Sequence, residues 1–234
     1  SMFTLLGARL SNRCATAEPS LRISGLVLLA VVFTAAYAHA QTPDGADPVK
    51  ATPSQPEGRW SSAGRFALGA LGGLTAHESG HLLFDFAFDA DPRFTRVEFH
   101  GIPFFAIAHR PDLSPRRELV VSSAGFWVQH AGSEWILTRR PQLRRERAPM
   151  LKGMLAFNIA TSVAYAGTAF ARTGPAERDT RGMAVSARID EPWIGAMILA
   201  PAALDAVRYA DPGAKWAAWT SRAMKAGIVL LLLR

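Results

Sequence analysis

Cysteine is almost absent from this chain, and its single occurrence, Cys14, falls near the N-terminus. One thiol cannot form an intrachain disulfide, and cleavage of an N-terminal leader would remove even that thiol. A disulfide-stabilised fold and a cysteine-ligated metal site are therefore excluded for the rest of the chain. Any metal ligands must be histidine or carboxylate side chains.

Acidic residues are in the minority, with 19 Asp and Glu against 26 Lys and Arg and a formal net charge of +7. A nucleic-acid partner would explain this balance, but no nucleic-acid-binding motif accompanies it. The basic residues instead fall in short clusters at the ends of apolar segments, which is typical of membrane-flanking positions. We therefore expect a lipid bilayer as a partner and no nucleic acid.

Long apolar runs are also few, and the mean hydropathy is only slightly positive, too low for a protein made wholly of transmembrane helices. One run, Gly153 to Ala171, has nineteen residues without a charge, which is close to the length that a transmembrane helix needs. The sequence predicts a mainly α fold, a membrane helix bundle with a short β-hairpin. The expected helices cover residues 63–88, 115–137, 150–172 and 193–209, with a short helix from Asp179.

The N-terminus has the three parts of a secretory signal. Three arginines precede the uncharged stretch Ile23 to Tyr37, and Ala38-His39-Ala40 provides an A-x-A cleavage site. We expect residues 1–40 to be a signal peptide, with an uncleaved anchor as the alternative. Residues 41–62 are rich in Pro, Gly and Ser and predict a flexible linker. Residues 63–234 would then form one membrane-embedded domain.

The hairpin is expected within Thr95 to His109, where apolar residues surround Gly101-Ile102-Pro103. Its edge could bind an extended peptide by strand addition. The alternative is a flap with a purely structural role. The apolar residues concerned are Val97, Phe99, Ile102, Phe104, Phe105 and Ile107.

The most informative motif is His77-Glu78-Ser79-Gly80-His81, an H-E-x-x-H pattern inside an apolar helix. Histidines four residues apart share a helix face, so both imidazoles can bind one metal ion. Glu78 can then take a proton from water at that metal. The alternative is a pair of core histidines bonded to a neighbouring carboxylate. Because isolated polar groups are costly to bury in an apolar helix, the motif favours a zinc site.

Further motifs follow the histidines in a fixed order. After the H-E-x-G-H helix come the hairpin with its central glycine, then Pro115 and Glu118, then Ala124 to Gln129 in the second helix. This order resembles the core of the site-2 protease family of intramembrane zinc metalloproteases, over about residues 63–208. That family has an Ala-Gly-Pro-Leu-Ala-Asn type motif where this chain has Ala-Gly-Phe-Trp-Val-Gln. The glycine is kept while proline and asparagine are replaced, so the resemblance is to a distant member.

The resemblance implies that an aspartate at the start of a later helix completes the zinc site. Asp179 follows a Gly-Pro loop, with Phe157-Asn158 upstream resembling a family Phe-Asn pair, and we favour it. Asp205, between Pro201 and Arg208, is the alternative. Without a ligand role, Asp179 would be a helix cap and Asp205 an ion-pair partner of Arg208.

A third possibility for the ligand is the pair His130 and Glu134, four apart on the second helix. A soluble zinc peptidase of the His-His-Glu type would use such a residue. Polar contacts between helices are the simpler expectation for both side chains, as they are for Gln129 and Asn158.

Together these patterns predict a zinc-dependent endopeptidase that cleaves membrane-associated proteins or peptides. His77, His81 and Asp179 would bind Zn²⁺, and Glu78 would be the general base. A membrane location of the bacterial inner-membrane type is expected, with the orientation left open because basic clusters flank both ends of the apolar segments. One alternative is an exported zinc metallopeptidase bound peripherally to the membrane. Another is a non-catalytic membrane scaffold with a structural H-E-x-x-H helix.

Overall fold

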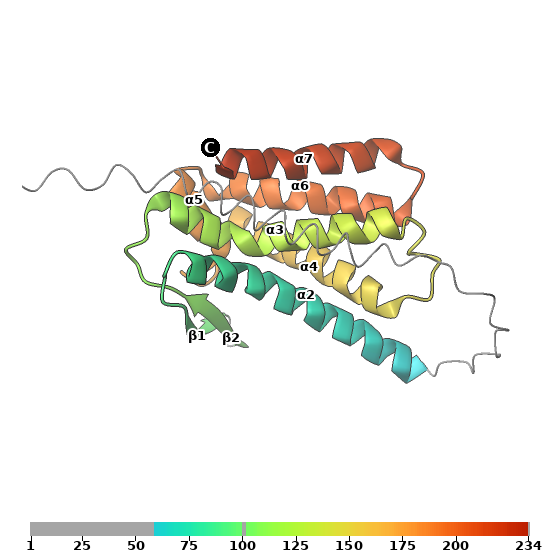
Figure 1. The fold of residues 1–234 in the computed structure, drawn as a ribbon, viewed down its shortest axis with the longest axis horizontal. Helices are drawn as coiled ribbons and strands as arrows, with labels where there is room; N and C mark the ends of the chain where they lie inside the picture. Colours follow the sequence, from blue (N-terminus) through green and yellow to red (C-terminus); the bar gives the residue numbers. More distant parts are fainter. Residues whose placement is uncertain (1–58, 100–101, 234) are drawn as a thin grey trace, which may run out of the picture. The chain divides into compact units, whose positions relative to one another are not determined.

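Six helices and one hairpin make up the part of the chain that the computed structural model describes, residues 59–99 and 102–233 (Figure 1). The architecture confirms a mainly helical fold with a short hairpin. The predicted signal or anchor, residues 1–40, and most of the predicted linker lie outside the described residues. In chain order the elements are α2 (Arg59–Ala87), β1 (Arg93–Phe99), β2 (Ile102–Ala108), α3 (Pro115–Arg139), α4 (Pro149–Ala171), α5 (Asp179–Ala187), α6 (Glu191–Ala210) and α7 (Lys215–Leu233).

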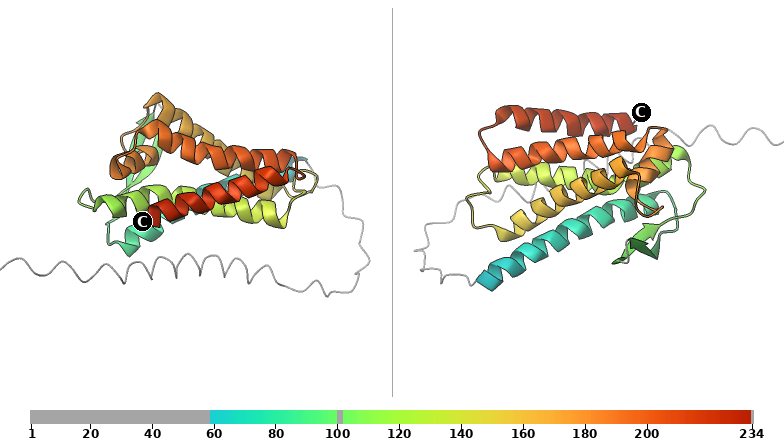
Figure 2. Two further views of the ribbon diagram at one scale, coloured as in Figure 1. Left: turned by 90° about the horizontal axis from the view of Figure 1, so that it is seen from above. Right: turned by 180° about the vertical axis from the view of Figure 1, so that it is seen from behind.

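The long helices α2, α3, α4 and α6 form the bundle, with close packing of α2 on α4, of α4 on α6 and of α2 on α3. The hairpin, the start of α3 and the short helix α5 lie at one end, which we call the hairpin end (Figures 1 and 2). The segments 140–148 and 211–214 lie at the other end, which we call the basic end. Helix α7 runs beside α6, on the side of the bundle away from α2.

Small residues bring α2 and α4 together. A Cβ at Gly69 would collide with the backbone carbonyl of Met150, and a Cβ at Gly153 would collide with that of Phe66. The two backbones therefore touch, an approach typical of small-residue contacts between membrane helices. Glycine lowers the helix propensity of α2, but at Gly69 it is needed for this close packing against α4.

Helix α2 ends in a polar turn before the hairpin. Asp89 and Asp91 have φ values of 55° and 52°, a left-handed conformation that aspartate tolerates better than most residues and that a helix cannot continue through. The antiparallel register then pairs Arg93 with Ala108 and continues to Phe99 with Ile102. The hairpin is thus confirmed and starts two residues before the predicted segment.

The helix boundaries agree with the sequence to within a few residues, apart from two differences. Helix α2 begins at Arg59, so residues 59–62 belong to it and not to the linker. Residues 215–233 form α7, a helix that was not predicted. Three basic residues, Lys215, Arg222 and Lys225, interrupt its apolar pattern, and two of them form ion pairs with α3 and α6.

One helix of the described residues, α4, is long and apolar enough to cross a membrane. The core of the hairpin end is a cluster of Phe126, Met183, Ala184, Ile194 and Ile198, which joins α3, α5 and α6. A second cluster at the basic end joins α3, the following loop and α4: Ile136, Leu137, Leu143 and Leu155.

Candidate metal centre

His77 and His81 are buried on one face of α2, with 2% and 6% of their surfaces exposed. The helix places them one turn apart, and their Nε2 atoms lie 3.2 Å from each other. The Nδ1 atom of His81 lies 2.8 Å from the carbonyl oxygen of Val121 in α3. Because a carbonyl can only accept, Nδ1 donates its proton in this bond. The bond orients the ring so that Nε2 faces His77 and Asp179, which is the direction that a shared metal ion requires.

Asp179, the first residue of α5, completes the group. Its Oδ2 atom lies 3.4 Å from the Nε2 atoms of both His77 and His81. The carboxyl is mostly buried, with 17% of the side chain exposed. Burial alone would raise the pKa of this carboxyl, but the positive charge of His81 and the closeness of both histidines hold it below its ordinary value. Asp179 therefore stays anionic at neutral pH.

The residues on either side of Asp179 anchor the start of α5 to the start of α6. Arg178 donates to both carboxylate oxygens of Glu191 at 2.7 Å, and Thr180 donates to the same carboxylate at 2.8 Å. This bidentate pair is nearly buried. Asp179 is therefore held between two anchored neighbours. Sequence reasoning missed this anchoring, since nothing in the spacing of Arg178 and Glu191 marks them as partners.

The three side chains fit a tetrahedral metal ion. Bonds of 2.0–2.1 Å place tetrahedral ligand atoms about 3.3 Å apart. The observed separations of 3.2, 3.4 and 3.4 Å match that edge. The Oδ2 atom of Asp179 is buried and has no hydrogen-bond partner among the described residues, and an unpaired buried carboxylate oxygen is costly without a cation. His77, His81 and Asp179 could therefore hold a metal ion.

The backbone of α3 leaves room for the two rings only because residue 125 is glycine. A Cβ at Gly125 would lie 2.6 Å from the Nε2 atoms of both His77 and His81. The next residue, Phe126, packs edge-on against His77 with ring centroids 5.3 Å apart. The glycine thus makes room for both histidines, and Phe126 forms part of the wall beside them.

Glu78 follows His77 directly and is half-buried. It is close enough to His77, His81 and Asp179 for the charges of all three to act on it. The predicted base therefore lies next to the predicted ligands.

Asp205, the alternative third ligand, lies in a different environment. It is 1% exposed, accepts hydrogen bonds from Ser221 and Lys225 at 2.8 Å, and pairs with Arg208 at 3.1 Å. The structure places it in an ion-pair network, as expected for an aspartate without a ligand role.

The pair on α3 is not part of the metal group either. Glu134 belongs to the same network as Asp205 and pairs with Arg208, Arg222 and Lys225. His130 is buried and does not join His77, His81 and Asp179. Asn158 donates to the Gln129 carbonyl and to Ser133, so it forms the expected contact between α4 and α3.

A second polar cluster joins the hairpin to the helices of the site. His109, just after β2, places Nε2 2.7 Å from Glu118 of α3 and Nδ1 3.5 Å from Asp85 of α2. Ser122 also donates to Glu118, at 3.1 Å. The hydrogen bond to Glu118 and the negative charges of Glu118 and Asp85 raise the pKa of His109, against the opposing effect of burial. The imidazole thus links the end of the hairpin to the two helices that surround the metal group.

Comparisons of this chain with protein families, with curated proteins and with solved structures gave no match.

Proposed function

We propose that this protein is a zinc-dependent endopeptidase that acts on membrane-associated proteins or peptides. The observation that carries the proposal is the convergence of the His77, His81 and Asp179 ligand atoms within 3.4 Å of one another. Two neutral imidazoles and one carboxylate are a donor set that zinc uses in hydrolytic sites with an open coordination position. The resemblance to the site-2 protease family supports the same assignment.

Zinc bound there would polarise a substrate carbonyl and lower the pKa of water. The chain itself supplies the proton transfers. Glu78 accepts a proton from the attacking water as the new C–O bond forms, and then delivers it to the nitrogen of the leaving amine as the peptide C–N bond breaks. Val121 orients the His81 ring, and Arg178 and Thr180 hold the start of α5, and with it Asp179, in place.

The substrate must reach this site as an extended chain, because a helix shields its peptide bonds. The sheet contains only β1 and β2 among the described residues, so each strand has one unpaired edge there. An extended segment can add to such an edge through backbone hydrogen bonds. His109 attaches the hairpin beside the metal group, which makes it a suitable guide for that segment.

A membrane location is supported by the outer surface of the bundle. In the apolar window of α4, only 28% of the residues are buried by the rest of the chain, whereas the core helix of a soluble protein is mostly buried. Large apolar side chains also face outward on the other helices, including Phe86 of α2 at 71% and Trp193 of α6 at 68% exposure. Apolar surface on this scale needs a cover, and lipid would provide one.

The test compares the wild type with Glu78→Gln in purified protein. Zinc is measured by plasma mass spectrometry, and hydrolysis is measured with fluorescein-labelled casein as an unstructured probe. We expect about one zinc per chain in both proteins, and a loss of about 10²–10⁴-fold in the rate of hydrolysis in the variant. Glu177→Gln is the matched control, because Glu177 is exposed and not part of the metal group.

Three results would separate the alternatives. A wild type without zinc contradicts the metal site. A wild type that holds zinc and cleaves nothing, with Glu78→Gln indistinguishable from it, indicates a scaffold. Extraction of the protein from membranes by alkaline carbonate would assign it to the membrane surface instead of the bilayer interior.

A further inference from the structure

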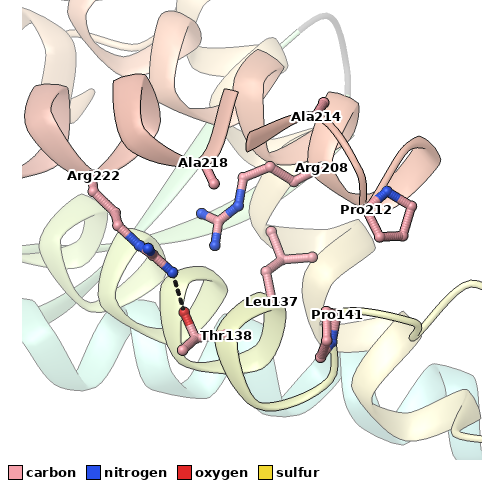
Figure 3. Close-up of a pocket in the computed structure, with 8 residues that line it drawn as sticks. All are labelled: Leu137, Thr138, Pro141, Arg208, Pro212, Ala214, Ala218 and Arg222. Atoms are coloured by element: carbon pink, nitrogen blue, oxygen red, sulfur yellow. Dashed lines mark hydrogen bonds between the residues drawn. The ribbon is translucent and has the colours of Figure 1, made fainter. Parts of the chain in front are cut away.

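The pocket at the basic end lies between α3, α6 and α7 and has a volume of about 190 Å³ (Figure 3). Arg208 of α6 and Arg222 of α7 line it, together with Thr138 of α3, to which Arg222 donates at 3.1 Å. The remaining walls are apolar and include Leu137, Pro141 and Ala218. Apolar walls with a few convergent polar groups are typical of sites for small amphiphilic ligands.

The charges around this pocket do not balance. Glu134 pairs with Arg208, Arg222 and Lys225, while Asp205 pairs with Arg208 and Lys225. Three cations therefore share two carboxylates, which leaves one excess positive charge. Arg208 is only 6% exposed, so water screens this charge less than it would at a free surface. An anion bound in the pocket would neutralise this excess positive charge.

The surroundings of the pocket are strongly basic. Residues 139–152 contain six basic side chains against the single acidic Glu146. Arg144 donates to the carbonyl of Ala210 at the end of α6, so this loop lies beside the pocket. Such a cluster attracts phosphates and the anionic surface of a bilayer.

Two tryptophans near the pocket favour the phosphate of a lipid over a free phosphate ion as its ligand. Trp216 and Trp219 at the start of α7 are 63% and 70% exposed, and the guanidinium of Arg222 lies 5.8 Å from the Trp219 ring centroid. Exposed tryptophan beside arginine is typical of the level of lipid headgroups. A free phosphate would use the arginines but neither the apolar walls nor the indoles.

The geometry points to a binding site for the phosphate of an anionic phospholipid in the pocket between α3, α6 and α7. Arg208 and Arg222 bind the phosphate, the apolar walls contact the glycerol and upper acyl chain, and the basic loop 140–148 and the α7 tryptophans lie at the headgroup surface. None of the metal-group residues takes part, so the site is independent of the proposed hydrolysis.

The test measures thermal unfolding of the full chain in a non-ionic detergent. Phosphatidylglycerol, phosphatidylcholine or inorganic phosphate is added at equal concentration. We expect phosphatidylglycerol to raise Tm by about 5 °C or more at saturation. Phosphatidylcholine and inorganic phosphate should leave Tm nearly unchanged. An equal rise with phosphatidylcholine, or the full rise with inorganic phosphate, would overturn the assignment.

Two variants locate the effect. Ala218→Phe fills the pocket without changing a charge and should abolish the rise produced by phosphatidylglycerol, while Ala223→Phe places the same ring on an exposed position of α7 and should keep it. If Ala218→Phe does not fold, a double variant, Arg145→Gln with Arg147→Gln, is measured in its place. Both arginines are exposed on the loop, and we expect this variant to lose at least half of the rise in Tm produced by phosphatidylglycerol. A rise that survives all these changes would show that the pocket is not the site.

Discussion

Gly125 lies directly against His77, so that a Cβ at position 125 would be 2.5 Å from Cε1 of the imidazole. The same Cβ would lie 2.6 Å from the Nε2 atoms of both His77 and His81, so the ligand atoms themselves would have to shift. We expect Gly125→Ala to displace His77 and lower zinc affinity about tenfold or more. A competition titration against a chromophoric chelator measures that affinity.

Gly167→Ala is the control for this experiment. Gly167 lies on α4, and a Cβ there would have nothing within 4 Å. Zinc affinity should be unchanged, and the helix should gain up to about 1 kcal/mol because alanine has the higher helix propensity. Equal zinc affinity in Gly125→Ala and the wild type would show that the histidines do not converge on an ion at the position the structure indicates.

The two aspartates that the sequence offered as third ligand should respond differently to the same substitution. Asp179→Asn removes the anionic oxygen that faces both histidines, so we expect the bound zinc to be lost while the fold persists. Asp205→Asn leaves Lys225 and Arg208 with less compensating charge, so we expect a loss of about 3 kcal/mol in the free energy of unfolding with zinc retained. Metal analysis and urea unfolding of the same samples distinguish the two outcomes.

Much of this site could be predicted because its strongest signals are local. The spacing of His77 and His81 implies one helix face, and the Gly-Pro loop before Asp179 implies the start of a helix. The choice between Asp179 and Asp205 could not be derived in this way. It depends on which of two distant segments packs against the histidines of α2, and residue spacing carries no information about that tertiary contact.

The features that the sequence did not indicate are long-range pairs. Arg178 and Glu191 are thirteen residues apart, on either side of helix α5, and Glu134 pairs with Arg208 across seventy-four residues. Helix α7 was not predicted, and the contacts that hold it are also long-range, since Lys225 and Arg222 pair with Glu134 of α3.

The link between His109 and Glu118 predicts a pH dependence. The folded-state pKa of His109 is raised above its ordinary value of about 6.5, through the hydrogen bond to Glu118 and the charges of Glu118 and Asp85, while burial and the charge of His81 oppose the shift. A raised pKa contributes stability that is complete below the unfolded value and is lost as the pH rises through the folded value. We expect His109→Gln to cost about 1–2 kcal/mol at pH 6 and clearly less at pH 9.

Urea unfolding of both proteins at the two pH values measures this difference. In a Glu118→Gln background the carboxylate that causes most of the shift is gone, so the pH dependence of the His109 contribution should shrink. A contribution of His109 that grows between pH 6 and pH 9 would contradict the ion-pair link.

The anchoring of Asp179 through its neighbours gives the last prediction. Glu191 holds both Arg178 and Thr180, and Glu191→Gln replaces a bidentate carboxylate by a single amide oxygen. The start of α5 should become less ordered, and zinc affinity should fall about tenfold although no ligand has changed.

Asp190→Asn is the matched control, because Asp190 is adjacent in sequence and pairs with Arg172, but both side chains are more than half exposed. An exposed pair contributes little, so this variant should bind zinc like the wild type. Equal losses in the two variants would indicate a general loosening of the connection between α5 and α6, and no loss in Glu191→Gln would show that Asp179 is held by the metal group alone.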